Sequence, residues 1–446
     1  MSIAEEQKHW HLQGNWAPVF EEVESNNLEI NGEVPEELYG LYVRNGMNPH
    51  SGYSDHWFHG DGMLHGLQFQ AGEVSYKNRY VQTPAYRDEE PSQPMGDLNY
   101  SKANTHIMRH AGKIFALEEA HFPWVVDADL NTIGAFDFDG ALKGPMTAHP
   151  RVCPVTGELL FFGYSLLEAP FVTYHRVNAE GTLVQSEAID IPRPVMMHDW
   201  NITRNYVIFM DLPLVFDLEA AMKGESPFGF QPDAGARLGV MPREGGNSDI
   251  RWFDIDPCYV FHPMNAYEDG DQIVLYVCRQ NSAMNSGMED IYGGEDTLGK
   301  LTRWTINLSS GQVKEERIDD VTTDFPRVDD RSIGLACRYG YAMGMDASAE
   351  SVSYDRYLYK YELASGDRQR HDLGKGVRGA EPVFAPRTST SEDDDGFVLS
   401  FAHDEIRDRS KFVILDAQNF AADPLAEIWL PQRVPYGAHG SWLPAE

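Results

Sequence analysis

Short runs with the alternation of β-strands follow one another along almost the whole chain, and helical periodicity is scarce. The runs 67–83 ("LQFQAGEVSYKNRYVQT") and 358–373 ("LYKYELASGDRQRHDL") alternate apolar and polar residues around a Gly-containing turn, as β-hairpins do. The best helical candidate is the short stretch 217–224, "DLEAAMKG". Because strands without covering helices must close a barrel, stack as a sandwich or form a propeller, the sequence predicts an all-β protein.

The length and the absence of a linker narrow the choice of architecture. At 446 residues the chain exceeds a typical domain of roughly 100–150 residues, yet no break in composition divides it. It contains no regular repeat of the WD or kelch type. We therefore expect one β-propeller domain over residues 1–446, with roughly six to eight four-stranded blades and residues 1–25 as an N-terminal extension.

The charge balance excludes some classes of partner. The chain has 36 Lys and Arg against 69 Asp and Glu, a formal net charge of -33. Nucleic-acid binding needs a basic face for the phosphates, so we expect no nucleic-acid partner. An anionic membrane surface would also repel the chain, so a membrane contact has to be hydrophobic.

Targeting and cysteine patterns favour a cytoplasmic protein. The N-terminus "MSIAEEQKHWHLQGNW" lacks the basic and apolar regions of a signal peptide, and no apolar run reaches the ~18 residues of a membrane span. The four cysteines lie far apart and form no CxxC pair; they are Cys153, Cys258, Cys278 and Cys337. We interpret them as reduced thiols rather than as a disulfide or zinc framework.

Four histidines lie near the heads of strand-like runs that are spread over most of the chain: His149, His198, His262 and His439. Any one of them alone would be interpreted as a structural histidine. In a propeller, however, the innermost strand of each blade lines one central axis, so residues far apart in sequence can converge. Four neutral imidazoles suit a divalent first-row metal such as iron(II), with two octahedral positions left open. Zinc more often has a tetrahedral set that includes cysteine.

Histidine ligands need carboxylates that accept a hydrogen bond from Nδ1–H and fix the orientation of the ring. Candidates are carboxylates embedded in apolar strands, where burial is costly without a partner. Glu119, Asp324 and Glu381 meet that condition, although each also fits an ordinary half-exposed strand position. The sequence does not choose between Glu119 and its neighbour Glu118.

These motifs together resemble the carotenoid cleavage oxygenase family over nearly the whole chain. Residues 38–69, "LYGLYVRNGMNPHSGYSDHWFHGDGMLHGLQF", are similar to the family's R-N-G-x-N-P and H-x-F-x-G-D-G-M signature. The four histidine segments match the family's four iron ligands in order and context. "GAEPVFAPR" (379–387) and "RVPYGAHGSW" (433–442) match the segments of its last carboxylate partner and its last ligand.

The resemblance implies a seven-bladed propeller with iron(II) on the central axis and a loop-built dome over one face. His149, His198, His262 and His439 would be both metal ligands and catalytic residues. Glu119, Asp324 and Glu381 would be their carboxylate partners. The implied reaction is that of a dioxygenase, which cleaves a conjugated C=C bond of a carotenoid or apocarotenoid with O2 to give two carbonyl products.

Three features qualify this resemblance. Asp324 stands where the family usually has glutamate, so its shorter side chain must reach the histidine by backbone adjustment or through water. His59 departs from the signature, and "HWFHGDGMLH" (56–65) permits an alternative metal site of His56, His59 and His65. Glu118 takes the place of a lysine that holds the phenol in stilbene-cleaving relatives, and it would repel a phenolate. We therefore expect carotenoids or apocarotenoids to be cleaved in preference to hydroxystilbenes.

Several alternatives stay open at this stage. The same chemistry could act on a stilbene or phenylpropenoid alkene, and a propeller could also be a non-enzymatic binding module. The partners expected are a hydrophobic polyene, O2 and, at the apolar run 210–224 ("MDLPLVFDLEAAMKG"), a peripheral membrane surface. The sequence leaves open which double bond is cleaved and the oligomeric state.

Overall fold

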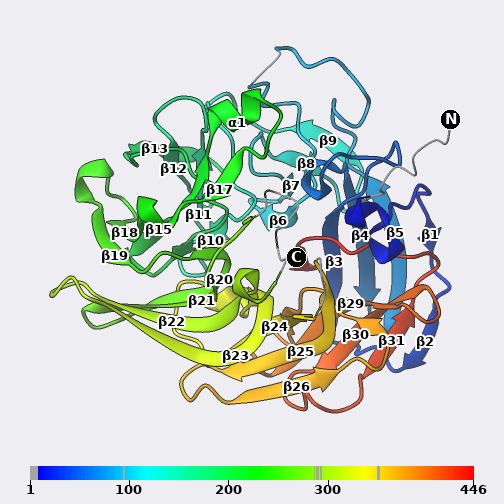
Figure 1. The fold of residues 1–446 in the computed structure, drawn as a ribbon. Helices are drawn as coiled ribbons and strands as arrows, with labels where there is room; N and C mark the ends of the chain where they lie inside the picture. Colours follow the sequence, from blue (N-terminus) through cyan, green and yellow to red (C-terminus); the bar gives the residue numbers. More distant parts are fainter. Residues whose placement is uncertain are drawn as a thin grey trace.

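The computed structural model describes residues 9–93, 96–285, 287, 291, 294–348 and 352–445. In these residues the antiparallel sheets follow one another around a ring, as Figure 1 shows. They form seven blades, because the 15-residue strand β23 (Val313–Arg327) ends one blade and begins the next. The seven-bladed all-β propeller is thereby confirmed.

Each blade runs from an innermost strand at the axis to an outermost strand at the rim. The first comprises, in that direction, β32 (Gly440–Pro444), β3 (Gly40–Met47), β4 (Gly62–Gln70), β5 (Glu73–Tyr80) and β1 (Glu24–Ser25). The second comprises β6 (His106–His110), β7 (Lys113–Leu117), β8 (Trp124–Val126) and β9 (Thr132–Ala135). The third comprises β10 (Arg151–Val152), β11 (Leu159–Tyr164), β12 (Val172–Val177) and β13 (Leu183–Ile189).

The fourth blade comprises β14 (Asn201–Ile202), β15 (Tyr206–Asp211), β18 (Ala236–Pro242) and β19 (Arg251–Ile255). The fifth comprises β20 (Tyr259–Asp269), β21 (Gln272–Gln280), β22 (Lys300–Asn307) and the first part of β23. The sixth comprises the end of β23, β24 (Tyr339–Met345), β25 (Tyr354–Glu362) and β26 (Arg368–Asp372). The seventh comprises β27 (Val377–Arg378), β28 (Val383–Pro386), β29 (Gly396–Asp404), β30 (Arg409–Asp416), β31 (Ala426–Trp429) and β2 (Glu29–Gly32).

Both expected hairpins are present, as β4–β5 and β25–β26. The expected helix is α1 (Leu218–Met222), where the Asp217 side chain accepts hydrogen bonds from the backbone N–H groups of Glu219 and Ala220. It joins the two strands of an extra hairpin, β16 (Leu214–Phe216) and β17 (Phe228–Phe230). Short 3-10 turns span Trp10–Leu12, Gly14–Trp16, Trp57–His59, Pro232–Ala234, Asn247–Asp249, Glu295–Thr297 and Asp330–Ser332.

The ring is closed at two places by pairing the two ends of the chain (Figure 1). The C-terminal strand β32 is the innermost strand of the first blade and pairs with β3, while the N-terminal strand β2 completes the seventh blade beside β31. At this closure Gly437 packs on Gly46, and a Cβ built on Gly437 would lie 3.0 Å from the Gly46 Cα. The close approach explains why the segments "RNGM" and "YGAHG" both carry glycine.

Residues 9–23 pack against the propeller, whereas Glu24 and Ser25 form β1 of its first blade. Trp16 contacts Tyr354 and Tyr436 at centroid distances of 5.1 and 5.0 Å, and the Asn15 side chain donates to the Val434 carbonyl oxygen. All four cysteines are free, as predicted. Within the described residues, no helix is long and apolar enough to cross a membrane.

The apolar run 210–224 is divided between the core and the surface. Leu212 and Leu214 are buried, whereas Leu218 and Met222 on α1 are exposed. The exposed side chains are compatible with a hydrophobic contact, and membrane contact at this surface stays a prediction.

Candidate metal centre

The seven innermost strands each bring one polar side chain to the axis. His149 precedes β10, His198 precedes β14, His262 lies in β20 and His439 precedes β32. The sixth blade contributes Asp324 from β23, and the seventh contributes Glu381 just before β28. His106, the first residue of β6, occupies the place of the second blade. The propeller thus gathers residues that are hundreds of positions apart.

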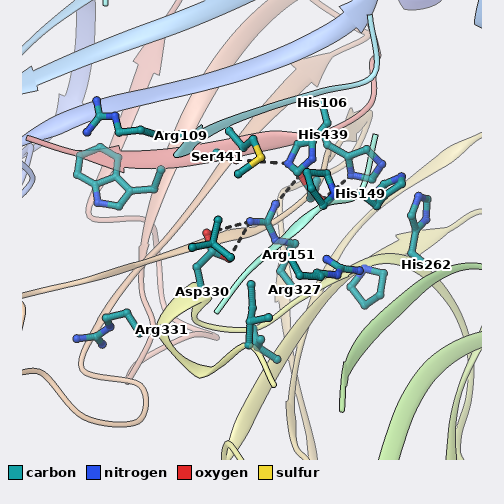
Figure 2. Close-up of a pocket in the computed structure, with 18 of the residues that line it drawn as sticks. His106, Arg109, His149, Arg151, His262, Arg327, Asp330, Arg331, His439 and Ser441 are labelled. Carbon is teal, nitrogen blue, oxygen red and sulfur yellow. Dashed lines mark hydrogen bonds and ion pairs between the residues drawn. The ribbon is translucent and has the colours of Figure 1, made fainter. Parts of the chain in front are cut away.

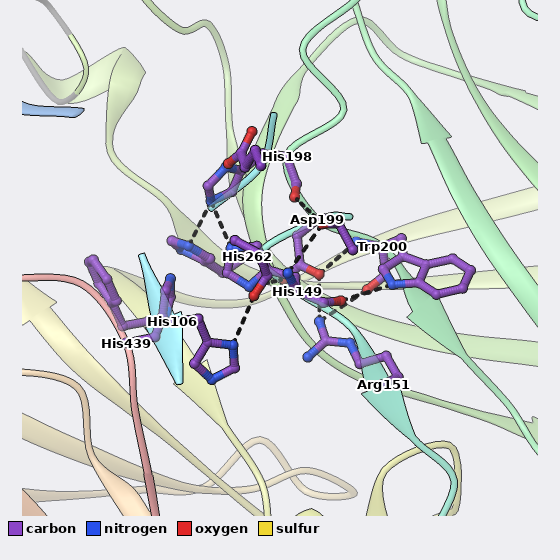
Figure 3. Close-up of polar contacts among 12 residues, drawn as sticks. His106, His149, Arg151, His198, Asp199, Trp200, His262 and His439 are labelled. Carbon is purple, nitrogen blue, oxygen red and sulfur yellow. Dashed lines mark hydrogen bonds and ion pairs between the residues drawn. The ribbon is translucent and has the colours of Figure 1, made fainter. Parts of the chain in front are cut away.

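The four predicted histidines converge, and all four are buried (Figure 3). Their ligand atoms all lie within 4.8 Å of one another. The Nε2 atom of His198 lies 3.0 Å from that of His149 and 3.2 Å from that of His262. His439 packs against His149 and His262 at ring-centroid distances of 4.6 and 4.7 Å. Within the described residues, no other group of His, Cys, Asp and Glu gathers in this way.

Each predicted carboxylate contacts the Nδ1 atom of one of these histidines. Asp324 Oδ1 lies 2.8 Å from His262 Nδ1, and Glu381 Oε1 lies 2.9 Å from His439 Nδ1. Glu119 Oε1 contacts His198 Nδ1. Since a carboxylate only accepts, Nδ1 carries the proton in these pairs, and the lone pair of Nε2 faces the centre.

The shorter Asp324 reaches His262 directly, through backbone adjustment rather than through water. The ladder between β23 and β24 is irregular from Asp324 to Arg327, and Phe325 has a φ of 51°. Such a conformation is uncommon for a bulky side chain. Asp324 is 1% exposed and also accepts a hydrogen bond from the Phe325 backbone N–H. The direct contact of Asp324 with His262 therefore coincides with an unusual backbone conformation at the next residue.

The ambiguity between Glu118 and Glu119 is resolved by their contacts. Glu119 contacts His198 and accepts a hydrogen bond from the Tyr164 hydroxyl at 2.6 Å. Glu118 instead accepts from Ser101, from the backbone of Lys102 and from His121. The charge of Glu118, which lines the dome cavity, is paired with His121, and the expected preference for polyenes over hydroxystilbenes stays a prediction.

A fourth carboxylate, Asp199, was missed in the sequence. Its Oδ2 lies 3.6 Å from His149 Nδ1, and its Oδ1 accepts from Arg151 at 2.6 Å (Figure 3). The indole N–H of Trp200 holds the other side of this segment by donating to the His149 carbonyl oxygen at 2.9 Å. The sequence signal was available: Asp199 is a lone carboxylate in the apolar segment "VMMHDW".

Replacing Asp199 by asparagine is expected to weaken metal binding by about ten-fold, the low end of the usual range for a ligand's hydrogen-bond partner. The effect is smaller than for the other carboxylates because 3.6 Å is longer than a hydrogen bond. The metal dissociation constant, measured by competition with a chromogenic chelator, checks this. A loss as large as that of Asp324→Ala would contradict the ranking.

The donor set fits a divalent cation. Burial and the neighbouring imidazoles hold the pKa of His149 and His439 well below the ordinary value, which favours neutral rings. Burial also opposes a charge on His198, but Glu119 outweighs it and raises the pKa of His198. Nitrogen lone pairs facing one another at 3.0 Å repel unless a cation lies between them. Neutral imidazoles are suitable ligands for a first-row metal.

The alternative site in residues 56–65 does not form. His65 is buried in β4 and contacts the Tyr76 hydroxyl at 2.8 Å, while His59 contacts Asp55 at 2.6 Å. His56 accepts a hydrogen bond from the Phe58 backbone N–H. Nor is His106 placed as a ligand: its Nδ1 is hydrogen-bonded to the Ala148 carbonyl oxygen at 2.8 Å, and its Nε2 lies 3.4 Å from the Ser441 hydroxyl instead of facing the four-histidine group.

Two cavities meet at the centre. Strand β20 contributes to both cavities. Phe261 lines the first, Pro263 and Met264 line the second, and His262 between them lines both. His262, Phe325 and His439 are common to both. The first, of about 500 Å³, we call the dome cavity because most of the residues that line it lie between strands. The second, of about 640 Å³, we call the axial cavity.

The two cavities differ in chemistry. The axial cavity is lined by guanidinium groups, including Arg151 and Arg327, and by carboxylates such as Asp330 (Figure 2). The dome cavity is lined largely by apolar and aromatic side chains, among them Trp57, Phe58, Leu166, Phe228 and Phe261. It is therefore the cavity that suits an apolar ligand beside the metal centre.

Comparison with known proteins agrees with this geometry. Residues 16–444 match the family model described as "Retinal pigment epithelial membrane protein". The chain is 36% identical to the carotenoid 9,10(9',10')-cleavage dioxygenase 1 of Pisum sativum, over 98% of this chain and 90% of that protein. It is 35% identical to the carotenoid cleavage oxygenase of Mycobacterium tuberculosis, over 99% of each chain.

A solved structure of lignostilbene dioxygenase from Pseudomonas brassicacearum superposes with a TM-score of 0.90. Its sequence is 29% identical, and the match covers 100% of both chains. The similarity extends over both the sequence and the propeller, so the chain belongs to the carotenoid cleavage oxygenase family.

Proposed function

We propose that this protein is a non-haem iron(II) dioxygenase that cleaves a conjugated C=C bond of a carotenoid or apocarotenoid with O2. The observation that carries this is the convergence of four buried histidines, three of which (His198, His262 and His439) line an apolar cavity. The known relatives include proteins named as carotenoid cleavage enzymes, at 36% and 35% identity. The products would be two carbonyl compounds.

The residues of the chain hold the metal and position the substrate. His149, His198, His262 and His439 would bind iron(II), which supplies the site where O2 is activated. Glu119, Asp324 and Glu381 keep Nδ1 of His198, His262 and His439 protonated and these rings oriented, so that Nε2 faces the centre. Their negative charge, like the ring lone pairs, favours a cation there.

The dome cavity would position the substrate. Phe325 packs against His262 and His439 at centroid distances of 4.8 and 5.1 Å, so a flat polyene can stack on aromatic rings beside the metal centre. Phe58 and Phe261 line the same cavity. Apolar walls exclude water from the reacting bond and hold one double bond at the metal.

Aerobic incubation of the iron-loaded protein with carotenoids, apocarotenoids and hydroxystilbenes is expected to give aldehydes from the carotenoid or apocarotenoid. The measurement is product identification by mass, with kcat/KM compared across the panel. Iron content gives an independent readout, and one iron per chain is expected. A protein that binds iron but cleaves 4-hydroxystilbenes with a higher kcat/KM than every polyene tried would contradict the substrate class.

A further inference from the structure

Glu118 and His121 form a polar pair in the wall of the otherwise apolar dome cavity. One carboxylate oxygen of Glu118 accepts from the Ser101 hydroxyl and the Lys102 backbone N–H, both at 2.8 Å, and from His121 Nδ1 at 2.9 Å. Burial opposes ionisation of Glu118, but His121 and these hydrogen bonds outweigh it and lower its pKa to about 2. The carboxylate is thus ionised and fixed in place.

This arrangement leaves the Nε2 edge of His121 available to the cavity. With Nδ1–H donated to Glu118, the ring has a set orientation, and Nε2 has no hydrogen-bond partner in the part of the chain that the structure describes. The His121 side chain is 24% exposed. Burial lowers the pKa of His121, but the charge of Glu118 outweighs it and raises that pKa above the ordinary value. The imidazolium form presents an Nε2–H donor.

Several other polar groups of the dome cavity already have partners, and His59, which also lines it, contacts Asp55 through Nδ1 and is 53% exposed. The Tyr164 hydroxyl donates to Glu119, the Asn104 amide donates to the Gly60 carbonyl oxygen at 2.7 Å, and the Thr105 hydroxyl donates to Asn104. An oxygen atom of a ligand in this apolar cavity would lose its hydrogen bonds to water. His121 is placed to replace them.

We infer that His121 binds an oxygen atom at one end of the substrate, either the carbonyl of an apocarotenal or a ring hydroxyl. This rests on the proposed function for the identity of the polyene. Glu118 and Glu119 are consecutive residues, and Glu119 contacts the ligand His198. The distance between the bound oxygen and the metal is therefore fixed by one short piece of backbone, so His121 also decides which double bond lies at the centre.

The test compares matched polyenes in wild type, His121→Phe, His121→Gln and Glu118→Gln. The first pair is an apocarotenal and the same polyene ending in a methyl group. The second pair is a polyene with a 3-hydroxylated end ring and the same polyene with an unsubstituted end ring. Affinity is measured without oxygen by quenching of tryptophan fluorescence. We expect His121→Phe to lose roughly ten-fold affinity for an oxygenated polyene and none for its hydrocarbon partner. The pair that responds identifies the oxygen that is bound.

Further variants separate recognition from a change in cavity shape. Glu118→Gln should weaken the same preference, and His121→Gln, which retains a donor, should restore part of it. His59→Phe is the matched control, because His59 lines the same cavity but its side chain is 53% exposed. Under air, His121→Phe should also give a broader mixture of cleavage products than wild type.

Three results would overturn the inference: unchanged affinities in His121→Phe, an equal loss for both members of each pair, or the same loss in His59→Phe. Failure of the proposed function has a different signature. In that case the wild-type protein would retain the binding preference but would cleave neither polyene under air.

Discussion

Replacing His262 by alanine is expected to leave the purified protein with a small fraction of the bound iron and without measurable cleavage. The physical reason is that His262 supplies one of four converging ring nitrogens, and no further side chain in the described residues is placed to substitute for it. Its removal also leaves the buried Asp324 carboxylate without its imidazole partner. Metal analysis of the purified variant and product formation from an apocarotenoid check both parts.

The control for this experiment is His59→Ala. His59 is 53% exposed, and its Nδ1 contacts Asp55 rather than any group of the four-histidine centre. Iron content should be unchanged in this variant. Full iron occupancy in His262→Ala would exclude the four-histidine centre as the iron site. The same expectation as for His262 applies to His149, His198 and His439.

Replacing Asp324 by alanine is expected to weaken metal binding or activity by roughly 10–100-fold, the usual cost of removing a ligand's hydrogen-bond partner. Asp324 is buried and contacts His262 Nδ1 at 2.8 Å, so alanine would free the ring to rotate. The measurement is the metal dissociation constant by chelator competition, together with kcat/KM on the best polyene. No change in either quantity would mean that another group orients His262.

Asp324→Glu gives the matched comparison. Glutamate is usual at this position in the family, but in this chain the shorter, buried Asp324 already lies 2.8 Å from His262 Nδ1. An added methylene in a packed site typically costs about 1–3 kcal/mol. We therefore expect weaker metal binding than in wild type, although stronger than in Asp324→Ala. Tighter binding than wild type would show that the Asp324 contact is strained.

Much of the fold could be predicted because it depends on local patterns. Alternation around Gly-containing turns predicted the hairpins β4–β5 and β25–β26, and the scarcity of helical periodicity predicted an all-β protein. The blade number was not available from those patterns. Local patterns do not reveal it because β23 serves two blades and β2 pairs with β31 near the other end of the chain. The number seven came instead from the family resemblance. Such pairings join strands that no local signal relates.

The site was predictable where a residue stood out against its surroundings. His149, His198, His262 and His439 could be recognised by their position at the heads of strands, and Asp324 and Glu381 as carboxylates in apolar strands. Asp199 carries the same signal, but it directly follows His198, whose own signal is the stronger one. Glu118 and Glu119 are chemically alike and adjacent, so the sequence could not separate their roles.

The sequence by itself determined which side chains could hold a metal, since residue type and burial tendency are local properties of the chain. Only the tertiary structure decided how they are used. Closure of the ring brings His439 beside His149 and His262. The backbone turn at Phe325 lets Asp324 reach His262. The direction of two neighbouring carboxylates assigns Glu119 to the metal centre and Glu118 to His121. Most of these contacts join segments that are far apart in the sequence. The packing of the blades fixes them, and no short stretch of sequence does.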